Sequence, residues 1–281
     1  MSRGPNIRSV RRDRTDRGGF APVAYLIFLM VPIYWLAVTS FKTQAELSQN
    51  LTLLPQAPTL QNYLYILTDS GWSMGYVNAL VYVAINVVLS IAVAVPAAYG
   101  FSRYRFAGDR HLFFWLLAAR MTPAAVLFLP LVQFYSSLGL MDRHVGVALA
   151  HCIFTVPVAV WILEGFMAKI PVELDEAARI DGFGPLAFFR KILLPAILPG
   201  VGVAAFFCFM ASWVELILAN ALTTTAAKPI NAVLFRAGGT LGFVHLPVLS
   251  AAGVLTILPG VVLIWFVRHH IARGLSMGRV G

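Results

Sequence analysis

Residues 176–182 read Glu-Ala-Ala-Arg-Ile-Asp-Gly, residues 192–195 read Ile-Leu-Leu-Pro, and Pro199 follows. Pro171 and acidic residues at 173, 175 and 176 open this polar stretch. A short helix is expected to begin there, because proline is tolerated in the first helical turn and acidic groups are favoured near a helix N-terminus. Glycine adopts positive φ without steric penalty, so Gly182 should end the helix. Residues 171–199 are therefore predicted as a helix, a sharp turn, and a second helix that begins at Gly184-Pro185 and runs to Pro195.

The composition surrounding this segment is that of a membrane protein. Apolar residues make up 59% of the 281-residue chain, and charged residues make up 12%, about half the usual share for a soluble domain. The formal net charge is +9, and in such a chain the positions of the charges matter more than their sum. A nucleic-acid-binding role is therefore excluded.

Charge-free runs predict six membrane spans. A bilayer core about 30 Å thick needs about 20 apolar residues in helix. No Lys, Arg, Asp or Glu occurs within residues 19–41, 71–102, 121–141, 145–163, 192–214 and 237–267. The spans are expected near 19–41, 73–101, 113–140, 145–168, 199–222 and 246–268. The first of these is read as a retained helix, since it is too long for a removed signal peptide and has no small-residue cleavage pattern.

The distribution of Lys and Arg predicts the orientation. With the N-terminus inside, the inner segments 1–18, 102–111, 169–198 and 268–281 hold sixteen basic residues, whereas the outer segments hold four. The positive-inside rule therefore places both termini and the 171–199 segment in the cytoplasm. The arginine-rich tail 1–18 is read either as a topology signal or as a site of attraction to anionic lipid headgroups.

The segment at 171–199 also suits docking to a partner. The small side chains of Ala177 and Ala178 allow close approach, and Glu176 and Arg179, three residues apart, can present charges on one face. A solvated connector between two spans would explain an acidic amphipathic helix equally well. The spacing of Glu-Ala-Ala, Asp-Gly, Ile-x-Leu-Pro and the last proline favours docking.

This spacing resembles the EAA loop of permease subunits in ABC importers. Further blocks are similar to those of the carbohydrate-type importers, which include the maltose permeases: Ala97-Ala98-Tyr99-Gly100-Phe101-Ser102-Arg103, Phe106-Ala107-Gly108, and the C-terminal Gly274-Leu275-Ser276-Met277-Gly278. The resemblance implies an all-α membrane protein with the six transmembrane helices of a type I ABC importer transmembrane domain. Its expected parts are a basic tail 1–18, a first helix with external loop 19–72, a transmembrane domain 73–271 containing the coupling loop 171–199, and a tail 272–281.

The resemblance also implies partners and coupling residues. The expected partners are a second permease subunit, two ATPase subunits, an external solute-binding protein and the lipid of a bacterial inner membrane. The chain has no Gly-x-x-x-x-Gly-Lys-Ser/Thr loop, so it is expected to be a transport subunit that binds no cofactor, with ATP and Mg used by the separate ATPase. Residues expected to couple to that ATPase are Glu176, Ala177, Ala178, Arg179, Asp181, Gly182, Pro195, Ser276, Met277 and Gly278.

Polar residues inside the spans are candidates for the substrate pathway, because charge at membrane depth is expensive and tends to be functional. The candidates are Asn78, Trp213, Glu215 and Asn220. The family often has Trp-Asn-Glu where this chain has Trp213-Val214-Glu215, which puts a substrate contact there in doubt. Arg120 and Glu164 are expected at equal depth near the cytoplasmic edge, where they would form an ion pair or contact substrate. The scattered histidines predict no metal site.

The expected cargo is a sugar, a sugar alcohol or glycerol, with a permease for peptides or amino acids as the alternative. A secondary transporter would need coupling residues near the midplane and often an internal repeat, and it would leave the register of the 171–199 segment unexplained. An intramembrane enzyme would need a catalytic set such as His-Glu-x-x-His, which the sequence does not contain.

Overall fold

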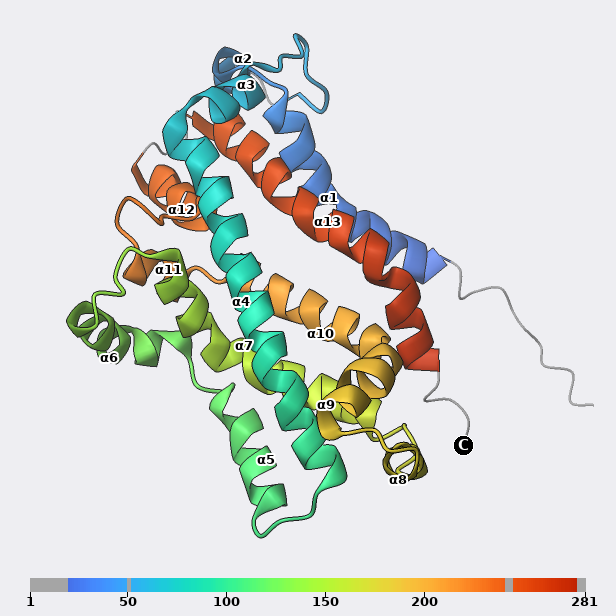
Figure 1. Cartoon of the computed structure of the whole chain (residues 1–281). Coiled ribbons are helices and arrows are strands. Elements are labelled where there is room, and N and C mark those ends of the chain that lie inside the picture. Colours follow the sequence, from blue (N-terminus) through green and yellow to red (C-terminus); the bar gives the residue numbers. More distant parts are fainter. Residues whose placement is uncertain (1–19, 50–51, 241–244, 277–281) are drawn as a thin grey trace, which may run out of the picture.

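The computed structural model describes residues 20–49, 52–240 and 245–276, and every regular element in these ranges is a helix (Figure 1). The predicted basic tail 1–18, together with Met277 and Gly278, lies outside the described residues. Ser276 is the last residue of the last helix.

The long helices follow the charge-free runs. They are α1 (Phe20–Ser40), α4 (Ser70–Arg103), α7 (His144–Met167), α10 (Leu194–Val214) and α13 (Leu246–Ser276). Shorter helices connect them: α2 (Gln44–Gln49), α3 (Gln61–Thr68), α5 (Asp109–Ala119), α6 (Ala124–Ser137), α8 (Glu173–Ile180), α9 (Pro185–Phe188), α11 (Ile217–Leu222) and α12 (Ile230–Thr240). In the described ranges five helices are long and apolar enough to cross a membrane, or up to six if the bent pair α5–α6 is one span.

The third span is not the continuous helix expected near 113–140. Helices α5 and α6 meet at an angle of 91°, and Arg120 to Pro123 separate them. Proline has no N–H for a helical hydrogen bond and disfavours helical backbone in the residue before it. Pro123 itself has extended backbone at φ −61° and ψ 131°, so the chain turns here instead of crossing straight.

The fifth span also differs from the expected 199–222. It begins at Pro185 and ends at Val214, so the second helix of the polar segment is continuous with the span and does not stop at Pro195. A π-helical turn over Phe189–Leu193 precedes α10, and in it Leu194 N–H donates to the Phe189 carbonyl. This local change of hydrogen-bond register accommodates Pro195, which has no N–H to donate.

The centre of the bundle consists of α4, α7 and α10, which pack against one another, while α1 pairs with α13 at the side. Small residues allow the close approach, as is common between membrane helices. Ala94, Ala98, Ala159 and Ala204 are fully buried. A Cβ on Gly200 would come within 2.6 Å of the Phe166 ring, so α10 and α7 nearly touch there.

The two ends of the bundle carry different elements (Figure 1). Helices α2 and α3 lie at one end, and α5 and α8 lie at the other. The start of α1 and the end of α13 both point away from α2 and α3, toward the half that contains α8. This arrangement separates the polar segment at 171–199 from the loop between α1 and α4.

Candidate functional site

Helix α8 presents one face to the bundle and one to the surroundings. Asp175 and Ala178 are buried, whereas Glu176, Ala177, Arg179 and Ile180 are exposed, and Ile180 is 86% exposed. The expectation that Ala178 takes part in a docking face is wrong, because it packs with Leu193 and Phe188 in the core. Its small size serves the contact of α8 with its own bundle.

The turn after α8 has the geometry that the sequence predicted. Gly182 has a positive φ of 81°, its N–H donates to the Arg179 carbonyl, and the Phe183 N–H donates to the Ala178 carbonyl. These two bonds form a Schellman motif, which satisfies carbonyl groups at a helix end. Asp181 and Gly182 are both exposed in this turn.

A buried ion pair, which sequence reasoning missed, holds α8 to the end of α4. Arg103 Nε donates to Asp175 Oδ2 at 3.1 Å, and the two side chains are 4% and 8% exposed. Tyr99 Oη donates to the same oxygen at 3.1 Å. In the sequence, Asp175 is recognisable only as a favourable charge near a helix start. The four-residue spacing of Tyr99 and Arg103 on α4 was the available signal, but nothing local identifies their partner.

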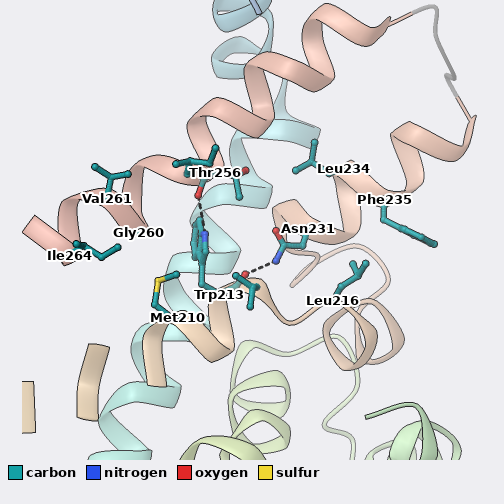
Figure 2. A pocket seen from close by; sticks show the side chains of 12 residues that line it. Met210, Trp213, Leu216, Asn231, Leu234, Phe235, Thr256, Gly260, Val261 and Ile264 are labelled. Carbon is teal, nitrogen blue, oxygen red and sulfur yellow. Dashed lines mark hydrogen bonds between the residues drawn. The ribbon is translucent and has the colours of Figure 1, made fainter. Parts of the chain in front are cut away.

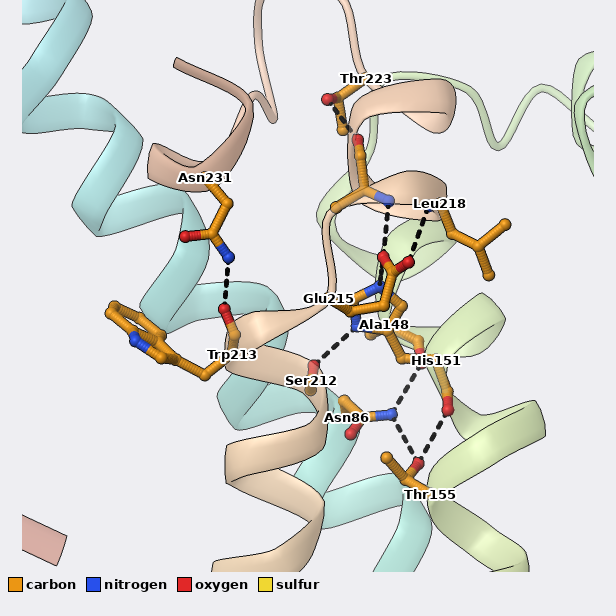
Figure 3. Close-up of polar contacts among 11 residues, drawn as sticks. Asn86, Ala148, His151, Thr155, Ser212, Trp213, Glu215, Leu218, Thr223 and Asn231 are labelled. Atoms are coloured by element: carbon orange, nitrogen blue, oxygen red, sulfur yellow. Dashed lines mark hydrogen bonds and ion pairs between the residues drawn. The ribbon is translucent and has the colours of Figure 1, made fainter. Parts of the chain in front are cut away.

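A polar layer crosses the middle of the central helices (Figure 3). Asn86 Nδ2 donates to the Ala148 carbonyl at 3.0 Å and to Thr155 Oγ1 at 3.1 Å. Ser90 lies 2.7 Å from the same Thr155 hydroxyl. Asn86 and Ser90 share one face of α4, as His151 and Thr155 do on α7. Hydrogen bonds of this kind between membrane helices are worth about 0.6 to 2 kcal/mol each, so the layer fixes the contact of α4 with α7.

Glu215 joins this layer from the break between α10 and α11. Its carboxylate lies 3.1 Å from His151 Nε2 and accepts from the backbone N–H groups of Leu218 and Ala219, both at 3.0 Å. His151 Nδ1 lies 2.7 Å from Ser212 Oγ. A neutral imidazole protonated at Nε2 satisfies both contacts, with Nδ1 accepting from the serine hydroxyl. Glu215 thus has a structural role, and His151 is a partner that the sequence did not reveal.

Trp213 and Glu215 lie on two different cavities. Glu215 lines a cavity of about 380 Å³ together with Arg120, Thr122 and His151. Trp213 lines a cavity of about 650 Å³ between α10, α12 and α13 (Figure 2). There its Nε1–H donates to the Thr256 carbonyl at 3.1 Å, and its ring stacks on Phe209.

The two asparagines proposed for the pathway line neither of these cavities. Asn78 is 4% exposed, donates to the Lys228 carbonyl at 3.0 Å, and lies 2.8 Å from His144 Nε2. It therefore ties α4 to the start of α7 and to the loop before α12. Asn220 lies on α11, and its Oδ1 has no hydrogen-bond partner among the described residues.

Arg120 and Glu164 do not meet. Arg120 Nη1 donates to the Phe154 carbonyl at 2.9 Å, and Phe154 is near the middle of α7, not at its edge. Glu164 lies ten residues further along α7, roughly 15 Å at 1.5 Å per residue, in a small cavity with Arg105 and Arg110. The expected common depth is wrong because the α5–α6 break places Arg120 level with the middle of α7, whereas Glu164 lies near the end of α7.

The Asp142 carboxylate, in the turn between α6 and α7, ties this turn to the segment after α11. The Asp142 carboxylate accepts hydrogen bonds from the backbone N–H groups of residues 224 to 227 at 2.9 to 3.3 Å and from the hydroxyls of Thr224 and Thr225. The backbone N–H groups of Ala226, Ala227 and Thr224 hold the pKa of Asp142 well below its usual range, despite partial burial, because they stabilise the charged form. This contact joins the turn to the segment that follows α11.

Comparisons with known proteins agree with this architecture. Residues 90–276 match the family described as binding-protein-dependent transport system inner membrane component. The chain is 30% identical over 257 residues to the trehalose transport system permease protein SugB of Mycobacterium tuberculosis, covering 90% of this chain and 93% of that protein. It is 31% identical over 273 residues to the arabinooligosaccharides transport system permease protein AraQ of Halalkalibacterium halodurans, covering 93% and 94%.

A third relative and a solved structure extend the comparison. The sulfoquinovosyl glycerol transport system permease protein SmoH of Agrobacterium fabrum is 30% identical over 253 residues, covering 89% of this chain and 88% of that protein. The crystal structure of a bacterial ABC transporter involved in the import of the acidic polysaccharide alginate matches with a TM-score of 0.74 and 23% identity, over 88% of this chain and 92% of that chain. The structural match shows a shared fold.

Proposed function

This chain belongs to the family of binding-protein-dependent transport system inner membrane components, and from that membership we propose that it forms half of the pathway of an ATP-driven importer for a carbohydrate or polyol. The chain is a multi-pass membrane permease subunit. The proposed cargo rests on the curated relatives, whose names describe the transport of trehalose, arabinooligosaccharides and sulfoquinovosyl glycerol.

The observation that carries the coupling proposal is the exposed face of α8. Glu176, Ala177 and Ile180 lie on an exposed face of a short helix whose other face is held by a buried ion pair and the core. The buried Asp175 fixes the orientation of α8, so Glu176, Ala177 and the 86% exposed Ile180 stay on the face that is open to a partner. The proposed occupant of this face is an ATPase subunit.

The proposed assembly contains a second permease, two ATPase subunits and an external solute-binding protein. The excess of basic residues in the segments on the α8 side supports a cytoplasmic position for α8 and for both termini in a bacterial inner membrane. The chain has no phosphate-binding loop, so ATP and Mg are assigned to the partner. Movement of α8 would pass to the bundle through Arg103 and through the helix that is continuous from Pro185 to Val214.

The proposed function is tested by purifying the complex from native membranes in mild detergent through a tag at the N-terminus. The expected result is co-purification of a second permease and a phosphate-loop ATPase, whose activity with the binding protein is stimulated by one sugar or polyol. A chain that purifies alone under conditions that preserve known complexes would contradict the proposal.

A variant of the exposed face tests the docking step. Ala177→Trp adds bulk where close approach is proposed, and it should reduce ATPase co-purification and uptake by about tenfold, as expected when a central interface contact is lost. Ala107→Trp is the matched control, because Ala107 is an exposed alanine in the turn between α4 and α5. Equal losses in both variants would argue against a specific docking face on α8.

A further inference from the structure

The cavity of about 380 Å³ lies where two helices break. The α5–α6 break contributes Arg120 and Thr122, and the α10–α11 break contributes Glu215. Backbone without helical hydrogen bonds is tolerated at membrane depth only where it is buried in protein or lines a water-filled space. Two breaks around one cavity therefore indicate a face that borders water or protein instead of acyl chains.

The charges on this face lead to the same conclusion. Arg120 is exposed and contacts the middle of α7, and Glu215 lies on the same cavity. Either charge would be costly against lipid. Helix α1 provides the contrast, since Tyr25 and Phe28 on its outer surface are 65% and 71% exposed and suit contact with lipid. The solute pathway is therefore expected beside Arg120 and away from α1.

Some polar groups of the cavity are already fully engaged. Thr155 bonds to Asn86, Ser90 and the His151 carbonyl, and both ring nitrogens of His151 have partners. The guanidinium of Arg120 has five N–H donors, and one contact to the Phe154 carbonyl uses one of its nitrogens. Glu215 has about four acceptor positions and receives three N–H groups. The hydrogen-bonding groups that remain for a solute are therefore several N–H donors of Arg120 and one acceptor position of Glu215.

Among the described residues no ion pair joins Arg120 to Glu215. The cavity lining contains Arg120 and Glu215, one basic and one acidic side chain that face the same space without contacting each other. A solute with a single net charge would be attracted by one of these side chains and repelled by the other, so the pair favours neither an anion nor a cation. Hydroxyl groups can accept from Arg120 and donate to Glu215 at once.

We propose that this cavity is a binding site of this subunit for a small neutral polyhydroxyl solute, with Arg120 donating to its oxygens and Glu215 accepting from its hydroxyls. The proposal rests on the proposed function and narrows its substrate class to neutral sugars and polyols. Phe154 provides an apolar surface for the ring carbons. The cavity is near the lower end of the roughly 300–1,000 Å³ of small-molecule sites, which suits a single small solute.

The larger cavity does not offer this chemistry. Its polar groups are bonded within the protein: Trp213 donates to the Thr256 carbonyl, Asn231 donates to the Trp213 carbonyl, and the Thr256 hydroxyl donates to the Ala252 carbonyl. The rest of its lining is mainly aliphatic (Figure 2). It therefore serves as the control site.

Thiol protection in the assembled transporter tests occupancy directly. Thr122→Cys places a thiol in the proposed site and Leu234→Cys places one in the larger cavity, each in a Cys152→Ser, Cys208→Ser background that retains transport. Glucose, trehalose, sorbitol, glycerol and glucuronate are the probes, with a water-soluble thiol reagent. At a concentration that fills about 90% of the sites, a transported neutral probe should slow labelling of Thr122→Cys about tenfold and leave labelling of Leu234→Cys unchanged.

Charge variants test the assigned roles. Arg120→Gln should raise the KM for the transported neutral probe by about 10- to 100-fold, the effect of losing hydrogen bonds from a charged donor. Arg110→Gln, an exposed arginine at the start of α5, should leave KM unchanged. Glu215→Gln removes the negative charge. The degree to which glucuronate protects Thr122→Cys, relative to the degree to which glucose protects it, should therefore rise. A purely structural defect would lower protection by glucuronate and protection by glucose to the same extent, and their ratio would not change.

The outcomes separate this proposal from the proposed function. If the wild-type complex transports a neutral probe but that probe protects Leu234→Cys or neither thiol, the site is wrong and the importer stands. If glucuronate protects Thr122→Cys better than glucose does in the complex that keeps Arg120 and Glu215, the charge-balance argument is wrong. If the complex imports amino acids or peptides and no sugar or polyol, the proposed function itself is overturned.

Discussion

Gly182 is the residue on which the turn after α8 depends. Its φ of 81° lies in the left-handed region, where a Cβ costs about 1–2 kcal/mol, although the space around it is open. Gly182→Ala is therefore expected to weaken the Schellman turn by about that amount and to lower uptake relative to ATP hydrolysis. The measurement is the ratio of transport to hydrolysis in proteoliposomes.

Gly184 provides the matched control for this prediction. It also has open space for a Cβ, but its φ is −69°, which any residue adopts. Gly184→Ala should leave the transport-to-hydrolysis ratio unchanged. If both alanine variants lower the ratio equally, the cause is added bulk and not the positive φ of Gly182.

Asp142 makes a contribution to the free energy of unfolding that depends on pH. Its folded pKa is lowered by the backbone N–H groups of Ala226, Ala227 and Thr224, so the stability it provides is complete above the ordinary carboxyl pKa near 4 and is lost as pH falls through the lowered folded pKa. Asp142→Asn should cost about 1 kcal/mol at neutral pH, a modest value because the site is partly open to water. Thermal unfolding in detergent measures the difference from wild type.

The pH profile distinguishes this charge effect from altered packing. The difference in Tm between wild type and Asp142→Asn should be constant between about pH 8 and pH 5, and it should shrink below about pH 4. Thr225→Val removes one hydroxyl donor but leaves the carboxylate, so its effect should be smaller with the same pH trend. A difference that grows as the pH falls would contradict the assigned role.

At the scale of elements, the contact between α4 and α8 is the feature most open to test. Removing one partner of a buried ion pair leaves an uncompensated charge and costs about 3–5 kcal/mol. Asp175→Asn leaves Arg103 buried without its charged partner, so α8 should loosen from α4. ATP hydrolysis should then continue while uptake is greatly reduced. Hydrogen exchange of peptides covering α8 should rise in the same variant.

Tyr99→Phe is a milder test of the same contact. It removes the hydroxyl that donates to Asp175 Oδ2 and keeps the ion pair, so uptake should fall much less than in Asp175→Asn. If Asp175→Asn instead transports with wild-type efficiency, α8 does not transmit motion through α4. The core contact of Ala178 and the helix that runs from Pro185 to Val214 would then be the remaining connections between α8 and the bundle.

At the scale of the whole molecule, topology is the property to measure. Leu53 lies in the loop between α2 and α3 and is 73% exposed, and Ile180 lies on α8 at the other end and is 86% exposed. With α8 in the cytoplasm, a membrane-impermeant thiol reagent added to spheroplasts should label Leu53→Cys and spare Ile180→Cys. Permeabilising the cells should make both thiols reactive. Labelling of Ile180→Cys before permeabilisation would show that α8 lies outside and would contradict the proposed orientation.

The membrane class, the approximate positions of the long helices and the register of the segment at 171–199 can all be predicted from the amino-acid sequence. These properties depend on local features: charge-free length, the positive φ that favours glycine at Gly182, and fixed spacing along the chain. Each is legible without knowing what packs against it. The helix over 173–180 and the turn after it were predicted from such signals.

The positions of the helix breaks and the pairing of the polar groups depend on how the helices pack, and neither could be predicted from the sequence. A run of apolar residues has no mark of depth, so the span expected near 113–140 did not indicate that Arg120 would reach the middle of α7. The partners of Arg103 and His151 are 72 and 64 residues away in the chain. Such pairs form because buried charges and amides need partners at their own depth, and depth is set by the packing of α4, α7 and α10 against one another.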